Sequence, residues 1–281
     1  MFRFALIVVL VSVLTGCHST HTVWDDFSTV DKVACVVVGM ESSGRFGPCP
    51  GCARDAEAVS RILREEYGYP VRTLVSQDAT RDAVVSSMRE AVSKVPADGL
   101  FIFHYSGHGG REDAGLGWTT EPQGLQDSTD EYLCLEDTYL LDDEIWDIIS
   151  QCHGHVVLIF DACHSQTMFR SVRPAALGAV APLVRSSGGF RLRPAVRALA
   201  DPGTALDMLC WSACLEDEQA YGDFSGGLLT TMLVKWWRPG LSYAELWALA
   251  CSDIALNRHV QIPAQTAYGD WMDRIWTEVF R

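Results

Sequence analysis

The sequence predicts an α/β fold in which a mostly parallel, six-stranded sheet carries helices on both faces. Two observations support this prediction. Short apolar runs recur along the 281-residue chain, and segments with helical periodicity lie between them. Such alternation is typical of parallel strands joined by right-handed crossovers, whose helices cover both faces of the sheet. The chain is long enough for one domain with a full core, and 48% of its residues are apolar.

The first half of the chain contains three of the expected strands and two helices. Residues 31–39 are rich in β-branched side chains, which suits a strand buried on both faces. Residues 53–67 place apolar side chains at helical spacing, and Gly68 ends that helix. The next elements in order are a strand at 70–75, a helix at 80–94 capped by Thr80, and a strand at 100–105.

The second half contains the other three strands and three helices. Residues 111–141 are acidic and rich in turns, with a small hairpin expected around Tyr132 to Tyr139. Carboxylates at Asp142 and Asp143 favour the start of a helix that ends near Cys152. Strands follow at 155–160 and 206–213, helices at 224–237 and 242–257, and an antiparallel edge strand at 274–280. Residues 170–205 show little periodicity, so we expect a long exposed loop there.

Two of the expected strands end in residues that can carry out chemistry. His108 follows the third strand in a glycine-rich turn, and Cys163 follows the fourth. Because the carboxyl ends of adjacent parallel strands meet at one edge of a sheet, we expect the imidazole and the thiol to lie together. An imidazole that accepts the proton of a thiol is the minimum machinery for acyl transfer. The amides of Gly109 and Cys163 are candidate donors to an oxyanion, and no third side chain is evident as a partner of His108.

Each of these residues taken alone has a simpler interpretation. A histidine in a loop and a cysteine buried as a structural thiol are both common. The catalytic interpretation is preferred because the two residues occupy equivalent positions after two apolar strands.

The first residues predict an export signal. One basic residue, Arg3, precedes an apolar run with the proportions of a signal peptide, too short for a typical membrane-spanning helix. The segment Leu14-Thr15-Gly16-Cys17 resembles the bacterial lipobox, in which the cysteine becomes the lipidated first residue of the mature chain. We therefore expect a signal peptide at 1–16, a tether at 17–30 that begins with lipidated Cys17, and a domain at 31–281. This places the domain in the bacterial cell envelope, facing the periplasm or the exterior; a plain signal peptide with a chance cysteine is the alternative.

The charge of the chain restricts its partners. A formal net charge of −14 argues against nucleic acid, because phosphate binding needs a cationic surface. An acidic protein is better suited to attract basic ligands.

The chain contains ten cysteines, which is a high count. If the protein is exported, these cysteines would enter an oxidising compartment, where disulfides can form. Apart from Cys17 and Cys163, these are Cys35, Cys49, Cys52, Cys134, Cys152, Cys210, Cys214 and Cys251. This even remainder permits disulfides without defining their pairing. Local disulfides or buried thiols are the simpler interpretations, and a four-thiolate zinc site from the closely spaced pairs Cys49/Cys52 and Cys210/Cys214 is an alternative.

Two motifs resemble a known family. The segments His104-Tyr-Ser-Gly-His-Gly109 and Asp161-Ala-Cys-His-Ser165 are similar to the two signature motifs of metacaspases, relatives of caspases in peptidase family C14. His108 precedes Cys163 by about 55 residues, close to the spacing of caspase-type enzymes. Weaker similarity covers the rest of the domain from about Val33, in Gly51-Cys-Ala-Arg-Asp55, in Trp211-Ser-Ala-Cys-Leu-Glu-Asp-Glu-Gln-Ala-Tyr221 and at Gln265-Thr266.

The resemblance implies a caspase-haemoglobinase fold and a cysteine endopeptidase that cuts after Arg or Lys. By position, His108 is the general base or acid, Cys163 is the nucleophile, and Asp55 and Asp161 form the acidic floor of the S1 pocket. Independent chemistry agrees, because two carboxylates near a nucleophile favour a guanidinium or ammonium group. Alternatively, Asp55 is a solvated residue in the first turn of a helix and Asp161 caps a turn. By this resemblance residues 31–169 correspond to a large subunit and 206–281 to a small subunit.

The chain departs from the family pattern at two positions. Gln166 replaces a usual glycine, which removes no reacting group. Many metacaspases are activated by calcium, and Asp130, Asp142 and Asp143 lie in the matching acidic region and could supply oxygen ligands. Arg170, however, stands where the family often has an aspartate, and a cation there would oppose calcium. No cofactor is required for the chemistry itself, and the simpler interpretation of the three acids is helix capping and surface charge.

The segment 170–205 also suggests self-processing. An enzyme that cuts after basic residues, with such residues in a loop beside its nucleophile, could cleave itself after Arg185, Arg191, Arg193 or Arg197. A basic flap that is never cut is the alternative.

Two other functions compete with the endopeptidase interpretation. One is a catalytically silent caspase-like lipoprotein that binds or scaffolds in the envelope, and the other is a hydrolase of the same fold that cuts after Asp or Asn. The sequence does not define the oligomeric state, and a monomer is expected.

Overall fold

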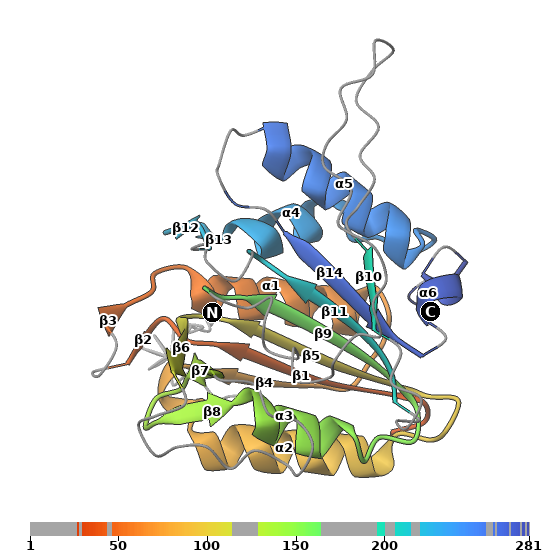
Figure 1. Ribbon diagram of the computed structural model, residues 1–281, viewed down its shortest axis with the longest axis horizontal. Helices are drawn as coiled ribbons and strands as arrows, with labels where there is room; N and C mark the ends of the chain where they lie inside the picture. Colours follow the sequence, from red (N-terminus) through yellow and green to blue (C-terminus); the bar gives the residue numbers. More distant parts are fainter. Residues whose placement is uncertain are drawn as a thin grey trace, which may run out of the picture.

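A seven-stranded sheet forms the centre of the molecule in the computed structural model (Figure 1). The structure describes residues 27, 30–43, 47–113, 129–163, 196–199, 206–214, 220–256, 261, 263–269, 271–275, 277–278 and 280. Its strands, in spatial order, are β10 (Val196–Leu199), β14 (Ala264–Tyr268), β11 (Asp207–Ser212), β9 (His155–Asp161), β5 (Leu100–Ser106), β1 (Val33–Gly39) and β4 (Val71–Val75). Neighbouring strands run parallel except β11 and β14.

Helices cover both faces of this sheet, as the sequence predicts (Figure 1). On one face lie α1 (Cys52–Glu65), α4 (Leu228–Trp236) and α5 (Tyr243–Leu256), and on the other lie α2 (Arg81–Lys94) and α3 (Asp142–Ile149). A single 3-10 turn, η2 (Ser76–Asp78), joins β4 to α2, and the short helix α6 (Trp271–Arg274) follows β14.

Two apolar cores, one on each face, hold the layers together. Successive side chains of β1 alternate between them: Val36 and Val38 belong to the core under α2 and α3, whereas Cys35 and Val37 belong to the core under α1. All four are fully buried. Because both faces are covered, the strand has no polar side, which explains its continuous apolar run.

Three small antiparallel sheets lie at the end of the molecule where β1, β5 and β9 finish (Figure 1). They are β2 (Ser42–Ser43) with β3 (Gly47–Pro48), β6 (Gly109–Asp113) with β7 (Thr129–Cys134) and β8 (Tyr139–Leu141), and β12 (Gly222–Asp223) with β13 (Gly226–Gly227). These short ribbons follow strands of the main sheet in the chain, so they surround its carboxyl edge.

Local sequence signals explain where the helices begin. Thr80 accepts a hydrogen bond from the backbone N–H of Ala83 at 3.3 Å, which confirms the expected N-cap of α2. Helix α1 begins directly after Gly51, whose φ of +94° is a left-handed conformation that few other residues adopt.

The structure corrects three of the sequence predictions. The antiparallel strand is β14 at 264–268, not 274–280, where the chain instead ends α6 and continues without a described strand. Residues 222–227 form the β12–β13 hairpin, so the helix expected from 224 begins only at Leu228. Val196–Leu199 pairs with β14 as a seventh strand, although the sequence placed it in the 170–205 loop. Val196–Leu199 is a strand because its backbone pairs with β14, and its own sequence has no strong strand signal.

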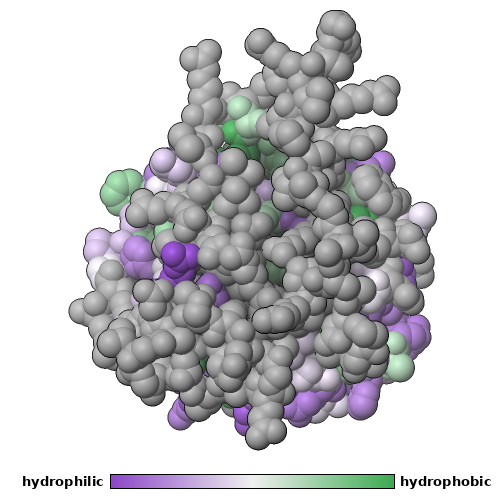
Figure 2. Space-filling model, in the orientation of Figure 1, coloured by the Kyte–Doolittle hydropathy of each residue, from purple (hydrophilic) through white to green (hydrophobic). Residues whose placement is uncertain are grey.

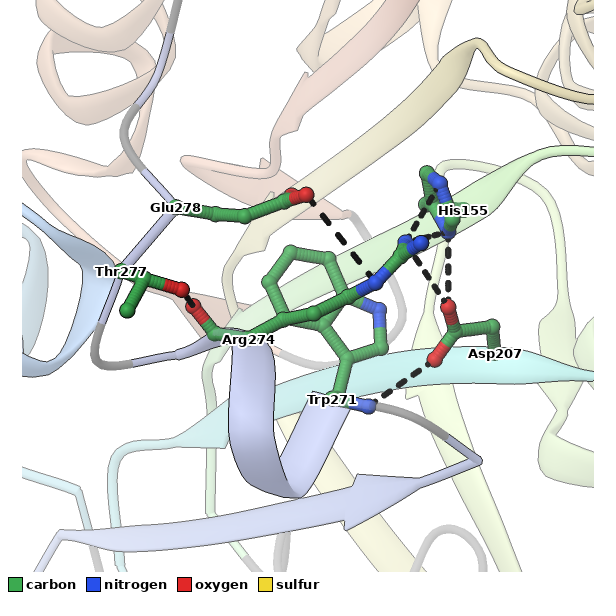
Figure 3. Close-up of polar contacts among 6 residues, drawn as sticks. All are labelled: His155, Asp207, Trp271, Arg274, Thr277 and Glu278. Atoms are coloured by element: carbon green, nitrogen blue, oxygen red, sulfur yellow. Dashed lines mark hydrogen bonds and ion pairs between the residues drawn. The ribbon is translucent and has the colours of Figure 1, made fainter.

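A polar cluster lies at the amino ends of β9 and β11, opposite the carboxyl edge of the sheet (Figure 3). The His155 imidazole donates through Nδ1 to Asp207 Oδ2 at 2.7 Å, and Arg274 contacts the same oxygen at 3.2 Å. The backbone N–H of Trp271 donates to Asp207 Oδ1 at 3.1 Å. This cluster therefore fixes α6 to the amino ends of β9 and β11.

The described surface visible in Figure 2 is mostly hydrophilic, with separate apolar patches. Phe224 and Tyr221, at 78% and 44% exposure, are the large apolar side chains most open to solvent among the residues described. No helix within the described ranges is both long and apolar enough to cross a membrane. The expected signal peptide and Cys17 lie outside the described residues.

Candidate active site

The strand register brings the ends of β1, β5 and β9 into one line. Gly39 pairs with Ser106, and Ser106 pairs with Asp161, across neighbouring parallel strands. His108 follows β5 by two residues, and Cys163 follows β9 by two residues. The structure therefore places both predicted reacting residues at the same edge of the sheet, as expected for an α/β fold.

A backbone carbonyl orients the imidazole of His108. Its Nε2 lies 3.3 Å from the carbonyl oxygen of Pro48 in β3. Because a carbonyl can only accept, we assign the proton to Nε2, which leaves Nδ1 able to accept a proton from a thiol. The partner that the sequence did not reveal is thus a main-chain atom.

Tyr105 and the backbone of Cys134 stabilise the turn that carries His108. The carbonyl oxygen of His108 accepts the backbone N–H of Cys134 at 3.0 Å. The buried Tyr105 hydroxyl lies 2.7 Å from the carbonyl oxygens of both His108 and Cys134, and can donate to one of them at a time. The backbone N–H of Gly107 donates to the carbonyl oxygen of Asp161 at 3.2 Å, so the turns after β5 and β9 are fastened together.

Gly109 lies directly against Cys163. A Cβ at position 109 would come within 2.6 Å of the Cys163 carbonyl oxygen, so only glycine permits this approach. Gly109 pairs with Leu133, and the bond from Cys134 N–H to the His108 carbonyl flanks that pair. In an antiparallel ladder this pattern marks a non-hydrogen-bonded pair, so the ladder does not use the Gly109 amide. The amide remains suited to the predicted oxyanion role.

The thiol of Cys163 is partly buried at this edge. Burial raises its pKa, and the negative charges of Cys49 and Asp161 raise it further, whereas a hydrogen bond from the backbone of Ala220 lowers it. The resting group is therefore a thiol that needs a base, which is the role predicted for His108.

Asp55 and Asp161 form a buried acidic pair near Cys163. Their side chains are 3% and 4% exposed. Asp55 Oδ2 accepts from the Ser106 hydroxyl at 2.6 Å and from the Gly227 N–H at 2.7 Å. Asp161 Oδ2 accepts from the Thr230 N–H at 2.7 Å, at the start of α4. The two predicted pocket residues are thus brought together and are not solvated.

Burial dominates the electrostatics of this pair. It raises the pKa of Asp55 to about 7, with a further increase from the charge of Asp161, while bonds from Ser106 and Gly227 act in the opposite direction. Burial likewise raises the pKa of Asp161 to about 6, opposed by Thr230. Within the described chain, no Lys, Arg or His contributes to either shift, and Asp161 Oδ1 has no hydrogen-bond partner. The pair therefore lacks a counter-charge.

The β12–β13 hairpin lies over these carboxylates. A Cβ at Gly226 would overlap Asp55 Oδ1, and a Cβ at Gly227 would overlap Asp161 Oδ2. Gly51, at the start of α1, meets the same hairpin at the backbone of Gly226. Glycines in the hairpin and at the start of α1 therefore let the backbone of the hairpin lie close to the acidic pair.

The family model of the caspase domain, peptidase family C14, matches residues 32–268, and so covers every group of this site. The chain belongs to the caspase-domain peptidases. It is 28% identical to Metacaspase-3 of Arabidopsis thaliana over 256 residues, which is 81% of this chain and 66% of that protein. It is also 31% identical to Metacaspase-1A of Neurospora crassa over 148 residues, which is 46% of this chain and 31% of that protein. The chain thus spans less than two thirds of the length of these relatives.

Solved structures confirm the caspase fold. A protein from Geobacter sulfurreducens superposes with a TM-score of 0.62 at 20% identity, covering 89% of this chain and 98% of that one. Caspase-1 from Spodoptera frugiperda superposes with a TM-score of 0.51 at 11% identity, covering 84% and 88%.

The three acids proposed as calcium ligands lie on two elements, α3 and β7. Asp142 and Asp143 lie in the first turn of that helix, 5% and 9% exposed, while Asp130 lies in β7 with a side chain outside the described residues. No three His, Cys, Asp or Glu side chains among those described form a group suited to a metal ion. Arg170 and Gln166 lie outside the described part of the chain. Calcium binding stays a prediction.

The four cysteines proposed for zinc do not form a metal-binding group among the described residues. None of the nine described cysteines is in a disulfide. Cys210 lies near the Ser212 hydroxyl at 3.7 Å, and the Cys214 thiol donates to the Ala162 carbonyl at 3.5 Å. Cys210 and Cys214 are thus buried thiols, which agrees with the simpler interpretation. Cys49 and Cys52 lie beside the candidate site, with their Sγ atoms 3.1 Å apart.

Three residues of this caspase-domain site were not predicted from the sequence. Ser106 binds Asp55, Thr230 binds Asp161, and the buried His104 places Nε2 3.1 Å from the Thr230 hydroxyl. Burial lowers the pKa of His104 to about 3, so it is neutral and structural. His104 and Ser106 share one face of β5, a period-two signal that was available in the motif. Thr230 lies more than a hundred residues away in the chain and had no such signal.

Proposed function

We propose that this chain is a cysteine endopeptidase that hydrolyses peptide bonds on the carboxyl side of Arg or Lys. The observation that carries this proposal is the buried Asp55–Asp161 pair: among the described residues it has no counter-charge and Asp161 Oδ1, two residues before Cys163, has no hydrogen-bond partner. A buried carboxylate without a partner is costly, and a guanidinium or ammonium group would offset that cost. The specificity therefore follows from the pocket chemistry, and the family match supports the reaction type.

The chemistry uses the residues at the sheet edge. His108 takes the Cys163 proton through Nδ1, while Nε2 stays bonded to the Pro48 carbonyl. The thiolate attacks the carbonyl carbon of the substrate, and the amides of Gly109 and Cys163 stabilise the oxyanion. His108 then gives the proton to the leaving amine, which frees the first product and leaves a thioester. Water activated by His108 hydrolyses that thioester and regenerates the thiol.

A fluorogenic peptide that ends in Arg tests this proposal on the purified chain. We expect wild-type turnover and a loss of at least about 1000-fold in Cys163→Ala, because the nucleophile is removed. Each assay is run with calcium and with a chelator, which also tests the calcium prediction. Equal rates in wild type and Cys163→Ala, or no turnover in either condition, would favour the non-catalytic scaffold.

Self-processing in the 170–205 segment belongs to the same proposal. Arg197 lies in β10, whose backbone pairs with β14, so cleavage there requires the strand to leave the sheet. Arg185, Arg191 and Arg193 lie outside the described residues. We expect fragments ending at one of these three in wild type and none in Cys163→Ala. The same fragments in both proteins would contradict self-cleavage.

We also propose that the chain is exported and anchored in the cell envelope by lipid at Cys17, with proteins or peptides as substrates. The Leu14-Thr15-Gly16-Cys17 motif supports this. Cys17→Ser should move the protein from the membrane to the soluble fraction. Unchanged membrane association in that variant would contradict the anchor.

A further inference from the structure

A pair of cysteines lies at the rim of the active site without a role in the proposed hydrolysis. The thiol of Cys52 donates to the sulfur of Cys49, and the two Sγ atoms are 3.1 Å apart. Cys52 is the first residue of α1 and is 4% exposed, whereas Cys49 in the preceding loop is partly exposed. The Cys49 thiol is therefore open to a reagent, whereas the Cys52 thiol is buried next to it.

The loop around the pair is fixed, so a bond between the sulfurs would form with little rearrangement. Glu41 holds it from one side, because the N–H of Gly51 donates to Glu41 Oε1 at 3.1 Å and the N–H of Cys49 donates to the Glu41 carbonyl. A disulfide has an S–S length of about 2.05 Å, so the sulfurs need to approach by only about 1 Å. Cys210, by contrast, lies 3.7 Å from the Ser212 hydroxyl.

The electrostatics assign a role to each thiol. The hydrogen bond from Cys52 lowers the pKa of Cys49, although burial and the charges of Asp161, Asp55 and Glu41 act against it. The same bond and burial raise the pKa of Cys52. The start of α1 adds a positive dipole end near both sulfurs. Cys49 is thus the attacking thiol, and Cys52 is the resolving thiol.

We propose that Cys49 and Cys52 form a thiol–disulfide exchange site that takes low-molecular-weight disulfides as its oxidant. Cys49 loses its proton, and the resulting thiolate attacks one sulfur of the small disulfide and releases one small thiolate, which takes up that proton. Cys52 loses its proton and attacks Cys49 in this mixed disulfide, forming the Cys49–Cys52 bond and releasing the second small thiol. The protein loses two electrons and two protons, and the small disulfide gains both.

This site differs from the catalytic thiol and does not depend on peptidase activity. Cys163 has no described cysteine as a hydrogen-bond partner, and burial raises its pKa. A disulfide reagent should therefore react first at Cys49 and close the local bond, leaving Cys163 as a thiol. Such an order would let the nucleophile survive mild oxidation.

The test equilibrates the purified full chain with mixtures of reduced and oxidised glutathione, followed by acid quench, alkylation, digestion and mass spectrometry. We expect the peptide with Cys49 and Cys52 to lose two hydrogens, while the peptide with Cys163 is still alkylated. The Cys210→Ser control should give the same pattern. In Cys52→Ser, glutathione should stay on Cys49 because the resolving thiol is missing.

Three results would overturn the proposal: both rim cysteines remain alkylatable in the most oxidising mixture, Cys163 is modified first, or Cys52→Ser carries no glutathione on Cys49. The wild-type measurement needs no variant, so a folding defect in Cys52→Ser does not leave the proposal open. Because the readout is mass and not hydrolysis, failure of the peptidase proposal would leave this result unaffected.

Discussion

At the scale of single residues, the site depends on a conflict between stability and function. Asp161 is kept in a buried place where its charge is unfavourable, and its pKa of about 6 records that cost. Under the proposed specificity, the charge becomes favourable only when a cationic side chain of the substrate binds. Catalytic sites commonly retain such perturbed groups at the expense of folding free energy.

Replacing this carboxylate should therefore stabilise the fold. The folded pKa lies above the unfolded value of 3.8, so the folded chain binds more protons between these pH values and its stability falls as pH rises through them. Above about pH 6 the full cost is present. Asp161→Asn keeps an oxygen for the Thr230 N–H and should raise the free energy of unfolding at pH 8 by roughly 1–3 kcal/mol.

Thermal unfolding at pH 4 and pH 8 measures this effect, in a Cys163→Ala background that prevents autolysis. The gain should be small at pH 4, where the wild-type carboxyl is protonated, and large at pH 8. Glu57→Gln, an exposed position on α1, is the control and should show no such difference. An Asp161→Asn chain that is less stable at pH 8 would refute this explanation.

Which residues the sequence could predict depends on the kind of atom involved. His108 and Cys163 follow two neighbouring strands, so their positions at the sheet edge followed from strand order, whereas Asp55 and Asp161 were assigned through the family resemblance. The Pro48 carbonyl that orients His108 is a backbone atom, and no side-chain pattern encodes it. Thr230 reaches Asp161 only because α4 packs over β9, which is a tertiary event.

At the scale of elements, the β12–β13 hairpin matters most for the pocket. Gly227 has a φ of −70°, which any residue can adopt, so its requirement is purely steric. A Cβ there would overlap Asp161 Oδ2. The sequence assigned this region to a helix, because apolar spacing continues into α4 and two-residue strands leave almost no periodic signal.

Gly227→Ala should therefore displace the acidic pair from the hairpin. We expect kcat/KM for the Arg-ending peptide to fall at least about 10-fold, together with a lower Tm. Gly240→Ala is the matched control: its φ of +91° makes alanine unfavourable by about 1 kcal/mol, but a Cβ there meets nothing within 4 Å. Equal losses of activity in both variants would show that the hairpin does not act on the pocket.

The antiparallel strand shows a second limit at this scale. Residues 274–280 carry apolar and aromatic side chains that resemble a strand, whereas Ala264–Tyr268 has a weaker pattern. Pairing with β11 on one side and β10 on the other defines β14, and such pairing depends on distant residues. Trp271, Ile275 and Phe280 are instead buried as core side chains of the C-terminal segment.

At the scale of the whole molecule, the candidate active site and the stabilising Asp207 cluster lie at opposite ends of the strands. His108 and Cys163 follow the carboxyl ends of β5 and β9, whereas Asp207 joins β9, β11 and α6 at the amino ends (Figure 3). Asp207→Ala removes the acceptor for His155 and Arg274 together, so we expect a loss of about 2–4 kcal/mol in unfolding free energy. Urea unfolding measures it.

This loss should leave kcat/KM almost unchanged in the fraction that stays folded. Glu278→Ala is the control, because its carboxylate lies 4.0 Å from Arg274 and should contribute little. An Asp207→Ala enzyme with wild-type stability, or with a large loss of kcat/KM at full folding, would contradict this separation of the two edges.

Under the proposed function, the buried acidic pair selects a cationic residue before the scissile bond. A set of peptides that differ only at this position tests it most directly, with citrulline as the neutral analogue of arginine. We predict that wild type prefers Arg and Lys over citrulline by roughly 100-fold or more in kcat/KM, and that Asp161→Asn loses most of this preference. A preference for Asp or Asn, or equal cleavage after Arg and citrulline, would contradict the claim.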